Sequence, residues 1–174
     1  YVNPGTMSNN WSYYTLYTNT YCDIEGMALT DFNSDGYLDI AATSCASMGG
    51  SGATFVLLNP KSNTGNWPCY TLDTSIYSCM ETISVGDLDG DGDMDVIVGI
   101  RKPFVKSYLS WYKNKSNGTS WSSRILMDTL STIGLQGQLP TVVDVNLDGY
   151  NDVICYRKDS AVSYWYKNNG SGSS

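Results

Sequence analysis

The residues of this chain that could do chemistry are concentrated in a nine-residue run, rich in Asp and Gly, that occurs three times: 31–39, 87–95 and 144–152. Each copy has oxygen-bearing side chains at positions 1, 3, 5 and 9 and a Gly at position 6, which permits a sharp bend. Position 7 can supply a backbone carbonyl. Hard oxygen ligands without His or Cys suit Ca²⁺ better than zinc or copper. They suit Mg²⁺ less well, because that ion retains its waters and demands stricter geometry.

Two other interpretations of these loops fit the sequence less well. An EF-hand needs an acidic residue at position 12 of the loop and flanking helices, but position 12 is Ala42, Val98 or Cys155. Asp- and Gly-rich turns are also ordinary hairpin connections, and a single copy would fit that explanation. Three copies in register, each with four oxygen side chains in the same places, favour metal binding.

The second copy with its flanks, Gly86-Asp-Leu-Asp-Gly-Asp-Gly-Asp-Met-Asp-Val-Ile-Val-Gly99, resembles the calcium-loop repeat called FG-GAP or VCBS. That repeat occurs in integrin α-chain propellers, in fungal propeller lectins and in secreted bacterial proteins. The resemblance covers all three copies and implies β-propeller blades with Ca²⁺ held in a hairpin of each blade. The family's Gly before the loop is kept only at Gly86, and the other copies have Thr30 and Val143 there. The side-chain ligands implied by the resemblance are Asp31, Asn33, Asp35, Asp39, Asp87, Asp89, Asp91, Asp95, Asp144, Asn146, Asp148 and Asp152, and the implied carbonyl ligands are those of Tyr37, Asp93 and Tyr150.

The repetition extends beyond the loops, whose starts lie 56 and 57 residues apart. A Trp opens an equivalent stretch at Trp11, Trp67 and Trp121, and each stretch leads to a Leu. Downstream of the second and third loops come Trp-Tyr-Lys-Asn segments at 111–114 and 165–168, with the degenerate copy Val-Leu-Leu-Asn at 56–59. The chain is therefore predicted to consist of three repeats of about 55 residues.

Each repeat has the pattern of β-strands rather than helices. The segments before the loops are 27–30, 83–86 and 140–143, and large and small residues alternate in the first two. The segments after the loops, 38–42, 94–98 and 152–155, are rich in β-branched residues. We predict an all-β fold of three propeller-blade-like repeats, each of about four antiparallel strands with the acidic loop in a hairpin. The predicted boundaries are an N-terminal strand segment at 1–20 and repeats at 21–76, 77–133 and 134–174, the last without its final Trp strand.

The number of repeats predicts an assembly. Propellers usually close with 4–8 blades, whereas this chain carries three. A Trp strand stands ahead of the first loop, and the last repeat would expect such a strand after it. We expect residues 1–20 of one copy to complete the last repeat of a neighbour, which gives a head-to-tail ring or filament. The alternative is that the 174 residues are a fragment of a larger adhesion propeller.

The cysteines and the sequons favour a secreted or extracellular glycoprotein. N-x-S/T sequons occur at Asn10, Asn114, Asn117 and Asn169. Five cysteines allow two disulfides and leave one thiol over. Antiparallel pairing about the first loop brings Cys22 and Cys45 together, and Cys69 and Cys79 bracket a short connection that a local bridge could close. Cys155 then remains as a buried thiol on a strand or cross-links two copies.

Composition excludes several classes of function. The formal charge is −7 with a pI near 4.3, which argues against a nucleic-acid binder. No apolar run approaches the ~20 residues that span a bilayer. The chain has no His, the commonest general base. Glu25 and Glu81, outside the loops, occupy equivalent repeat positions that indicate a structural role. Ten of the 17 acids are implied ligands, and three bound Ca²⁺ would add +6 to the charge of −7 and leave about −1.

We therefore predict a non-enzymatic, extracellular, Ca²⁺-stabilised glycoprotein with a structural or adhesive role and with other copies of itself as partners. Most of the Trp residues recur with the repeat, so they are expected to pack within the sheets. A carbohydrate-binding propeller lectin is the alternative, because Trp and Tyr can stack on sugars. A polysaccharide-active enzyme that uses carboxylates is a remote alternative.

Overall fold

The structure is a computed structural model that describes residues 13–18, 23–45, 52–62, 65–76, 79–101, 106–130, 138–157 and 162–170. Every regular element in these residues is a β-strand, which confirms the predicted all-β class. None of them forms a helix long and apolar enough to cross a membrane. The strands are β1 (Ile24–Thr30), β2 (Asp39–Ser44), β3 (Gly52–Leu57), β4 (Cys69–Ile76), β5 (Cys79–Gly86), β6 (Asp95–Arg101), β7 (Ser107–Tyr112), β8 (Asn114–Ser116), β9 (Ser120–Trp121), β10 (Ile125–Leu130), β11 (Gln138–Val143), β12 (Asp152–Arg157) and β13 (Val162–Tyr166).

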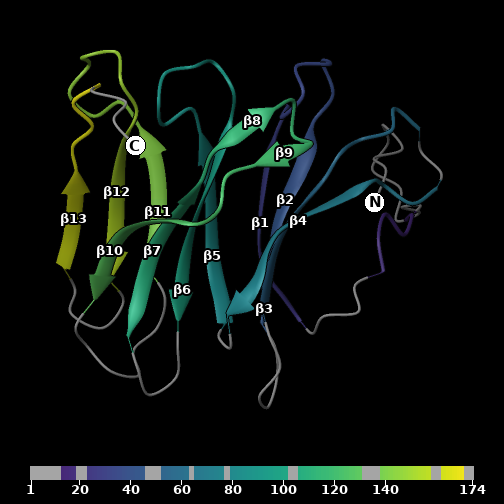
Figure 1. Ribbon diagram of the computed structural model, residues 1–174, viewed down its shortest axis with the longest axis horizontal. Helices are drawn as coiled ribbons and strands as arrows, with labels where there is room; N and C mark the ends of the chain where they lie inside the picture. Colours follow the sequence, from purple (N-terminus) through teal and green to yellow (C-terminus); the bar gives the residue numbers. More distant parts are fainter. Residues whose placement is uncertain are drawn as a thin grey trace, which may run out of the picture.

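Within the described residues the strands form three larger antiparallel sheets and one small hairpin (Figure 1). Sheet 1 has the order β1-β2-β3-β4, sheet 2 the order β5-β6-β7-β10, and sheet 3 the order β11-β12-β13. The hairpin of β8 and β9 lies between β7 and β10 in the chain. Each larger sheet takes its strands from one of the three predicted repeats.

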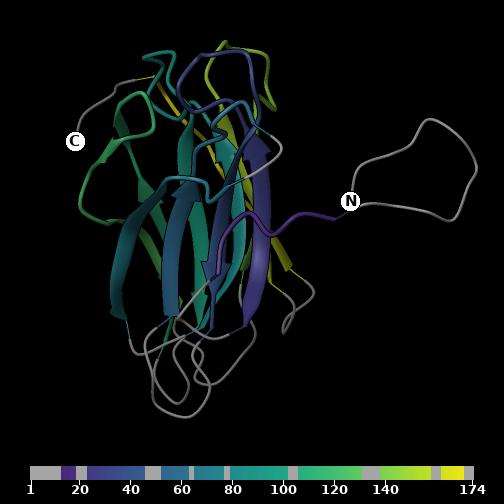
Figure 2. The same ribbon diagram turned by 90° about the vertical axis from the view of Figure 1, so that its right-hand side faces the viewer.

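Each acidic loop closes the hairpin between the first two strands of its sheet, as the sequence predicts. The last pair before the loop is Thr30 with Asp39 in sheet 1, and its equivalents are Gly86 with Asp95 and Val143 with Asp152. The Asp at position 9 is therefore fixed in the backbone ladder at the start of the second strand. All three loops lie at the same end of the sheets (Figures 1 and 2).

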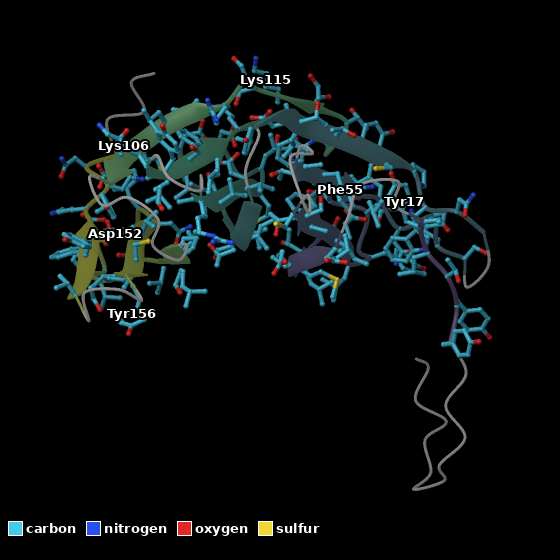
Figure 3. All side chains as sticks on the ribbon, turned by 90° about the horizontal axis from the view of Figure 1, so that it is seen from below. Tyr17, Phe55, Lys106, Lys115, Asp152 and Tyr156 are labelled. Atoms are coloured by element: carbon cyan, nitrogen blue, oxygen red, sulfur yellow. The ribbon has the colours of Figure 1, made fainter. Side chains whose placement is uncertain are left out.

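The sheets stand side by side in an arc, and the first strand of each sheet lies next to the first strand of the neighbouring sheet (Figure 3). Strand β5 contacts β1 of sheet 1 and β11 of sheet 3. Apolar side chains pack against one another in both spaces between the sheets. Val56 of sheet 1 and Val98 of sheet 2 belong to one buried cluster, and Ile97 of sheet 2 and Val153 of sheet 3 belong to another.

The two faces of each sheet have constant roles. Sheets 2 and 3 pack on the preceding sheet through the face that we call face A. Sheets 1 and 2 pack on the following sheet through the opposite face, which we call face B. The equivalent faces of all three sheets carry the same names. Side chains alternate between the faces along each strand, so the cross-strand register fixes the members of each face. The equivalent cross-strand rows on face B are Ala28-Ala41-Val56-Tyr70, Ser84-Ile97-Trp111-Ile125 and Thr141-Ile154-Trp165.

The structure corrects one predicted disulfide. The Cys69–Cys79 bridge is wrong, because Cys69 is a free thiol. Cys69 begins the eight-residue strand β4 and Cys79 begins β5. The length of β4, about 23 Å, separates the two residues, whereas a disulfide spans roughly 4.4–6.8 Å between Cα atoms.

The states of the other cysteines that the structure describes agree with the predictions from the sequence. Cys45 forms a disulfide, and its N–H donates to the Asp23 carbonyl at 2.9 Å, so the chain before β1 runs beside it. Cys22, the predicted partner of Cys45, lies outside the described residues. Cys155 is a fully buried thiol outside any disulfide, as expected.

Candidate metal centres

The first acidic loop is folded by its own side chains. The Asp31 carboxylate accepts hydrogen bonds from the N–H groups of Gly36 at 2.7 Å and Asp35 at 3.1 Å. The Asn33 carbonyl oxygen accepts a second bond from the Asp35 N–H at 3.1 Å. Gly36 has a φ of +87°, which an L side chain rarely adopts, and this explains why position 6 is Gly. Positions 1, 3 and 5 are thus drawn to one side of the turn.

The other two loops use the same construction. The position 1 carboxylates accept from the position 6 N–H in Gly92→Asp87 at 2.9 Å and Gly149→Asp144 at 2.9 Å. The N–H at position 7 donates to the position 5 carboxylate in all three copies. These bonds are Tyr37 to Asp35 at 3.0 Å, Asp93 to Asp91 at 3.0 Å and Tyr150 to Asp148 at 3.1 Å.

The Asp at position 9 ties each loop to the body of its sheet. Asp95 accepts from the Leu88 N–H at 3.0 Å, inside the loop, and from the Asn114 N–H at 2.8 Å, after β7. Asp39 and Asp152 repeat both contacts with the equivalent N–H groups. All three position 9 side chains are fully buried. Because both carboxylate oxygens already accept a backbone bond, any metal would share them.

The second loop comes closest to a complete metal centre. Carboxylate oxygens of Asp87, Asp89 and Asp95 all lie within 4.8 Å of one another. Asp89 Oδ1 is buried and has no hydrogen-bond partner, which is the condition expected of an oxygen placed to bind a cation. In the other two loops Asn takes the place of Asp89 at position 3. The carboxylate and carbonyl donors fit Ca²⁺.

A lysine lies over each loop, a contact that the sequence did not reveal. The Lys113 ammonium bonds to Asp89 and lies 2.9 Å from an Asp91 carboxylate oxygen. Lys61 lies 3.4 Å from Asp35, and Lys167 lies 3.5 Å from Asp148. In all three loops the lysine lies beside the position 5 carboxylate, so a cation stands at the same position of each loop.

The electrostatics of the second loop also favour a bound cation. Burial, together with the nearby carboxylates of Asp89 and Asp91, raises the pKa of Asp95 to about 7, against the two backbone hydrogen bonds that lower it. A divalent ion would oppose this repulsion and favour the ionised form. At Asp152 burial also acts to raise the pKa, but hydrogen bonds from Asn168, Trp165 and Val145 outweigh it, so the pKa is lowered.

Two asparagines join neighbouring repeats, a role that sequence reasoning missed. The Asn114 amide donates to the Phe32 carbonyl in the first loop at 3.0 Å. The Asn168 amide donates to the Leu88 carbonyl in the second loop at 2.7 Å. Phe32 and Leu88 both hold position 2 of their loops. The recurrence of Tyr-Lys-Asn was the signal available in the sequence, but the acceptor lies about 80 residues earlier in the chain.

The structure distinguishes the predicted glycosylation sites by the exposure of their asparagine side chains. Asn114 is fully buried, and its side chain both donates to Phe32 and accepts from the Gly118 N–H at 2.9 Å. A glycan on Asn114 is therefore incompatible with this fold, and that prediction is wrong. Asn117 and Asn169 are exposed and stay predictions. Asn10 lies outside the described residues.

Comparison with known proteins supports the resemblance that the loops carry. No curated protein matches the chain. Residues 31–98, which include the first and second acidic loops, match the model of the FG-GAP-like repeat. That match supports the assignment of these repeats to the FG-GAP family.

Proposed function

We propose that this chain is a Ca²⁺-stabilised, non-enzymatic module of propeller-blade repeats with a structural or adhesive role outside the cell. One observation carries the proposal: in all three acidic loops the position 6 N–H donates to the position 1 carboxylate, and the position 9 Asp is buried. In the second loop Asp89 adds a buried oxygen without a partner. We infer one Ca²⁺ in each loop, held by the side chains and carbonyls that the resemblance implies.

The stacking of the sheets supports the blade interpretation. Four-stranded antiparallel sheets whose first strands gather on one side are the units of a propeller, and sheets 1 and 2 have this form. The Cys45 disulfide supports an oxidising, extracellular location. Assembly of copies head to tail is part of the proposal, because the three sheets of the described residues form an open arc and a propeller closes with about 4–8 blades.

Calorimetric titration of the metal-free protein with Ca²⁺ tests the metal claim. We expect saturable binding with a stoichiometry of about three ions per chain, and much weaker binding of Mg²⁺ in a parallel titration. Absence of binding heat, together with an unchanged circular dichroism spectrum on Ca²⁺ addition, would show that the loops are ordinary turns.

Carbohydrate binding is a second candidate because of the cavity between sheets 2 and 3. This cavity has a volume of about 200 Å³ and combines aromatic with polar walls, among them Trp111, Tyr166 and Asn151. Aromatic rings beside amides are the usual surroundings of a bound polar ligand. A glycan array probed with the Ca²⁺-loaded protein tests this candidate. Saturable binding that Trp111→Ala abolishes supports it, and no bound glycan contradicts it.

A further inference from the structure

The two sheet-to-sheet contacts among the described residues follow one rule. Face A of sheet 2 packs on face B of sheet 1, and face A of sheet 3 packs on face B of sheet 2. At each contact the later sheet donates an Asn amide to the position 2 carbonyl of the earlier loop, as Asn114 does to Phe32 and Asn168 to Leu88. The rule leaves two outer faces, face A of sheet 1 and face B of sheet 3.

Face A of sheet 1 is apolar and open at its first strand. Met27 is 69% exposed and Leu29 is 60% exposed. Their equivalents in sheet 2, Ile83 and Val85, are half-buried against sheet 1. Beside them lies a cavity of about 300 Å³ whose walls are almost entirely apolar. This face has the composition of a sheet-to-sheet contact without a sheet on it.

Face B of sheet 3 is open in the complementary way. Trp165 is 48% exposed, whereas its equivalent Val56 in sheet 1 is fully buried. Val145, at position 2 of the third loop, is 43% exposed, whereas Phe32 and Leu88 at that position are 1% and 8% exposed. The residues that fill the two existing contacts therefore have exposed counterparts here.

Residues 13–18 lie on the outer part of face A of sheet 1. Tyr17 contacts the ring of Phe55 with 5.4 Å between the ring centroids, and the Leu16 carbonyl accepts from the Trp67 N–H at 2.9 Å (Figure 3). The fourth strands lie on the following sheet in the same way. Tyr112 of sheet 2 donates to Asp73 of β4 at 2.9 Å. The segment 13–18 thus occupies the place of a fourth strand that belongs to a preceding sheet.

Sheet 3 has three strands in the described residues, and its outer strand β13 has no fourth strand beside it there. In sheets 1 and 2 the third strand pairs with a fourth, β4 or β10, that lies on the face A of the next sheet. A sheet 3 placed on face A of sheet 1 would therefore bring β13 alongside residues 13–18.

We propose that a second copy of this chain docks face B of its sheet 3 on face A of sheet 1, with its β13 beside residues 13–18. The Asn59 side chain, which already donates to the Leu38 carbonyl at 3.2 Å, directs its second N–H to the carbonyl of Val145 of the partner subunit. This inference rests on the proposed head-to-tail assembly and specifies its interface. A second copy is the occupant because it carries a face that matches, element by element, the face that sheets 1 and 2 already bury.

Because the interface is heterologous, each face can be blocked separately. Leu29→Lys places a charge on face A of sheet 1, and Thr141→Lys places one on face B of sheet 3. Both side chains are exposed within the chain, so the fold is retained. Leu126→Lys is the matched control, because Leu126 is 54% exposed but lies on the outer strand β10, away from both faces. Sedimentation velocity in Ca²⁺ over a range of concentrations gives the association state.

We expect the wild type and Leu126→Lys to associate beyond dimers, and each blocked variant alone to weaken association at least about 100-fold, since a buried unpaired charge is costly. An equimolar mixture of the two blocked variants should form dimers and stop there, through the one pair of intact faces. Asn59→Leu should weaken association roughly tenfold.

The contrary results are distinct. If the wild type associates and the blocked variants associate equally well, the interface lies elsewhere, and the proposed assembly stands without this inference. If Thr141→Lys still dimerises while Leu29→Lys does not, face A pairs with itself and the inference is wrong. If the wild type is monomeric at every concentration while Ca²⁺ still raises its melting temperature, both the interface and the assembly fail and the metal claim survives.

Discussion

The side-chain amide of Asn168 donates a 2.7 Å hydrogen bond to the carbonyl of Leu88, which lies 80 residues earlier in the chain. Asn114 makes the equivalent bond to Phe32, 82 residues earlier. Each bond joins the end of one sheet's third strand to the acidic loop of the preceding sheet. The geometry of an acidic loop is thereby coupled to the packing of the neighbouring sheet.

This coupling predicts that removing the asparagine amide that joins two sheets lowers the free energy of unfolding more than removing an asparagine amide that bonds within one sheet. Asn114→Leu leaves the buried Phe32 carbonyl without its donor, and we expect it to lower the free energy of unfolding by about 1–3 kcal/mol. Asn59→Leu is the matched control, because within the described residues of one chain the Asn59 amide donates to the Leu38 carbonyl of its own sheet rather than to another sheet, and that bond is exposed. Urea unfolding at a concentration that keeps the protein monomeric gives both values. Equal losses in the two variants would contradict the structural role of the inter-sheet bond.

A close contact between sheets 2 and 3 predicts the effect of a single methyl group. A Cβ at Gly86 would lie 2.4 Å from Val142 Cγ1, so Gly86→Ala must push the two sheets apart. We expect a loss of about 1–3 kcal/mol in the free energy of unfolding. The double variant with Val142→Ala should recover part of that loss. If Gly86→Ala unfolds at the wild-type urea concentration, the sheets are not in contact there.

Within the second loop, two neighbouring carboxylates should differ in their effect on Ca²⁺ binding. Asp89 has the buried oxygen without a partner, whereas Asp93 is expected to contribute only its backbone carbonyl. Asp89→Asn should weaken Ca²⁺ binding at that site by roughly tenfold or more, about 1.4 kcal/mol, and Asp93→Asn should leave it nearly unchanged. Calorimetric titration of the two isosteric variants measures the difference. The reverse order of affinities would show that the ligand assignment is wrong.

Cys69 and Cys155, which form no disulfide in the described part of the chain, should differ in reactivity. Burial raises the pKa of the Cys155 thiol to about 12, and Asp128 adds to the shift. Near pH 8 almost no thiolate is present at Cys155, so we expect iodoacetamide to modify the half-buried Cys69 well before Cys155, as peptide mass spectrometry would show. The pKa of the Cys155 thiol is higher in the folded than in the unfolded state. The stability that the buried, protonated thiol contributes is therefore fully present below about pH 9 and is lost as the pH rises toward 12. Faster labelling of Cys155 than of Cys69 in the native protein would contradict its burial.

Much of this architecture is local and could be predicted from the sequence. The loops, the strands on either side of them and the hairpins they close depend on residues within about ten positions of one another. The inter-sheet bonds of Asn114 and Asn168 could not be predicted, because their acceptors are backbone carbonyls that carry no sequence signature. The buried state of Asn114, which excludes its glycan, follows from the same tertiary contact. The predicted Cys69–Cys79 bridge is wrong because residues close in sequence need not be close in space, and the whole of strand β4 separates these two.

The dependence of thermal stability on Ca²⁺ tests the central claim most directly. Scanning calorimetry of the Leu29→Lys variant, in Ca²⁺ and in EDTA and at a concentration at which sedimentation shows it to be monomeric, separates metal binding from assembly. We predict a melting temperature that rises with Ca²⁺ concentration above that in EDTA, because an ion bound only by the folded state stabilises it by mass action. The same melting temperature in EDTA and in millimolar Ca²⁺ would contradict the claim that the three acidic loops hold calcium.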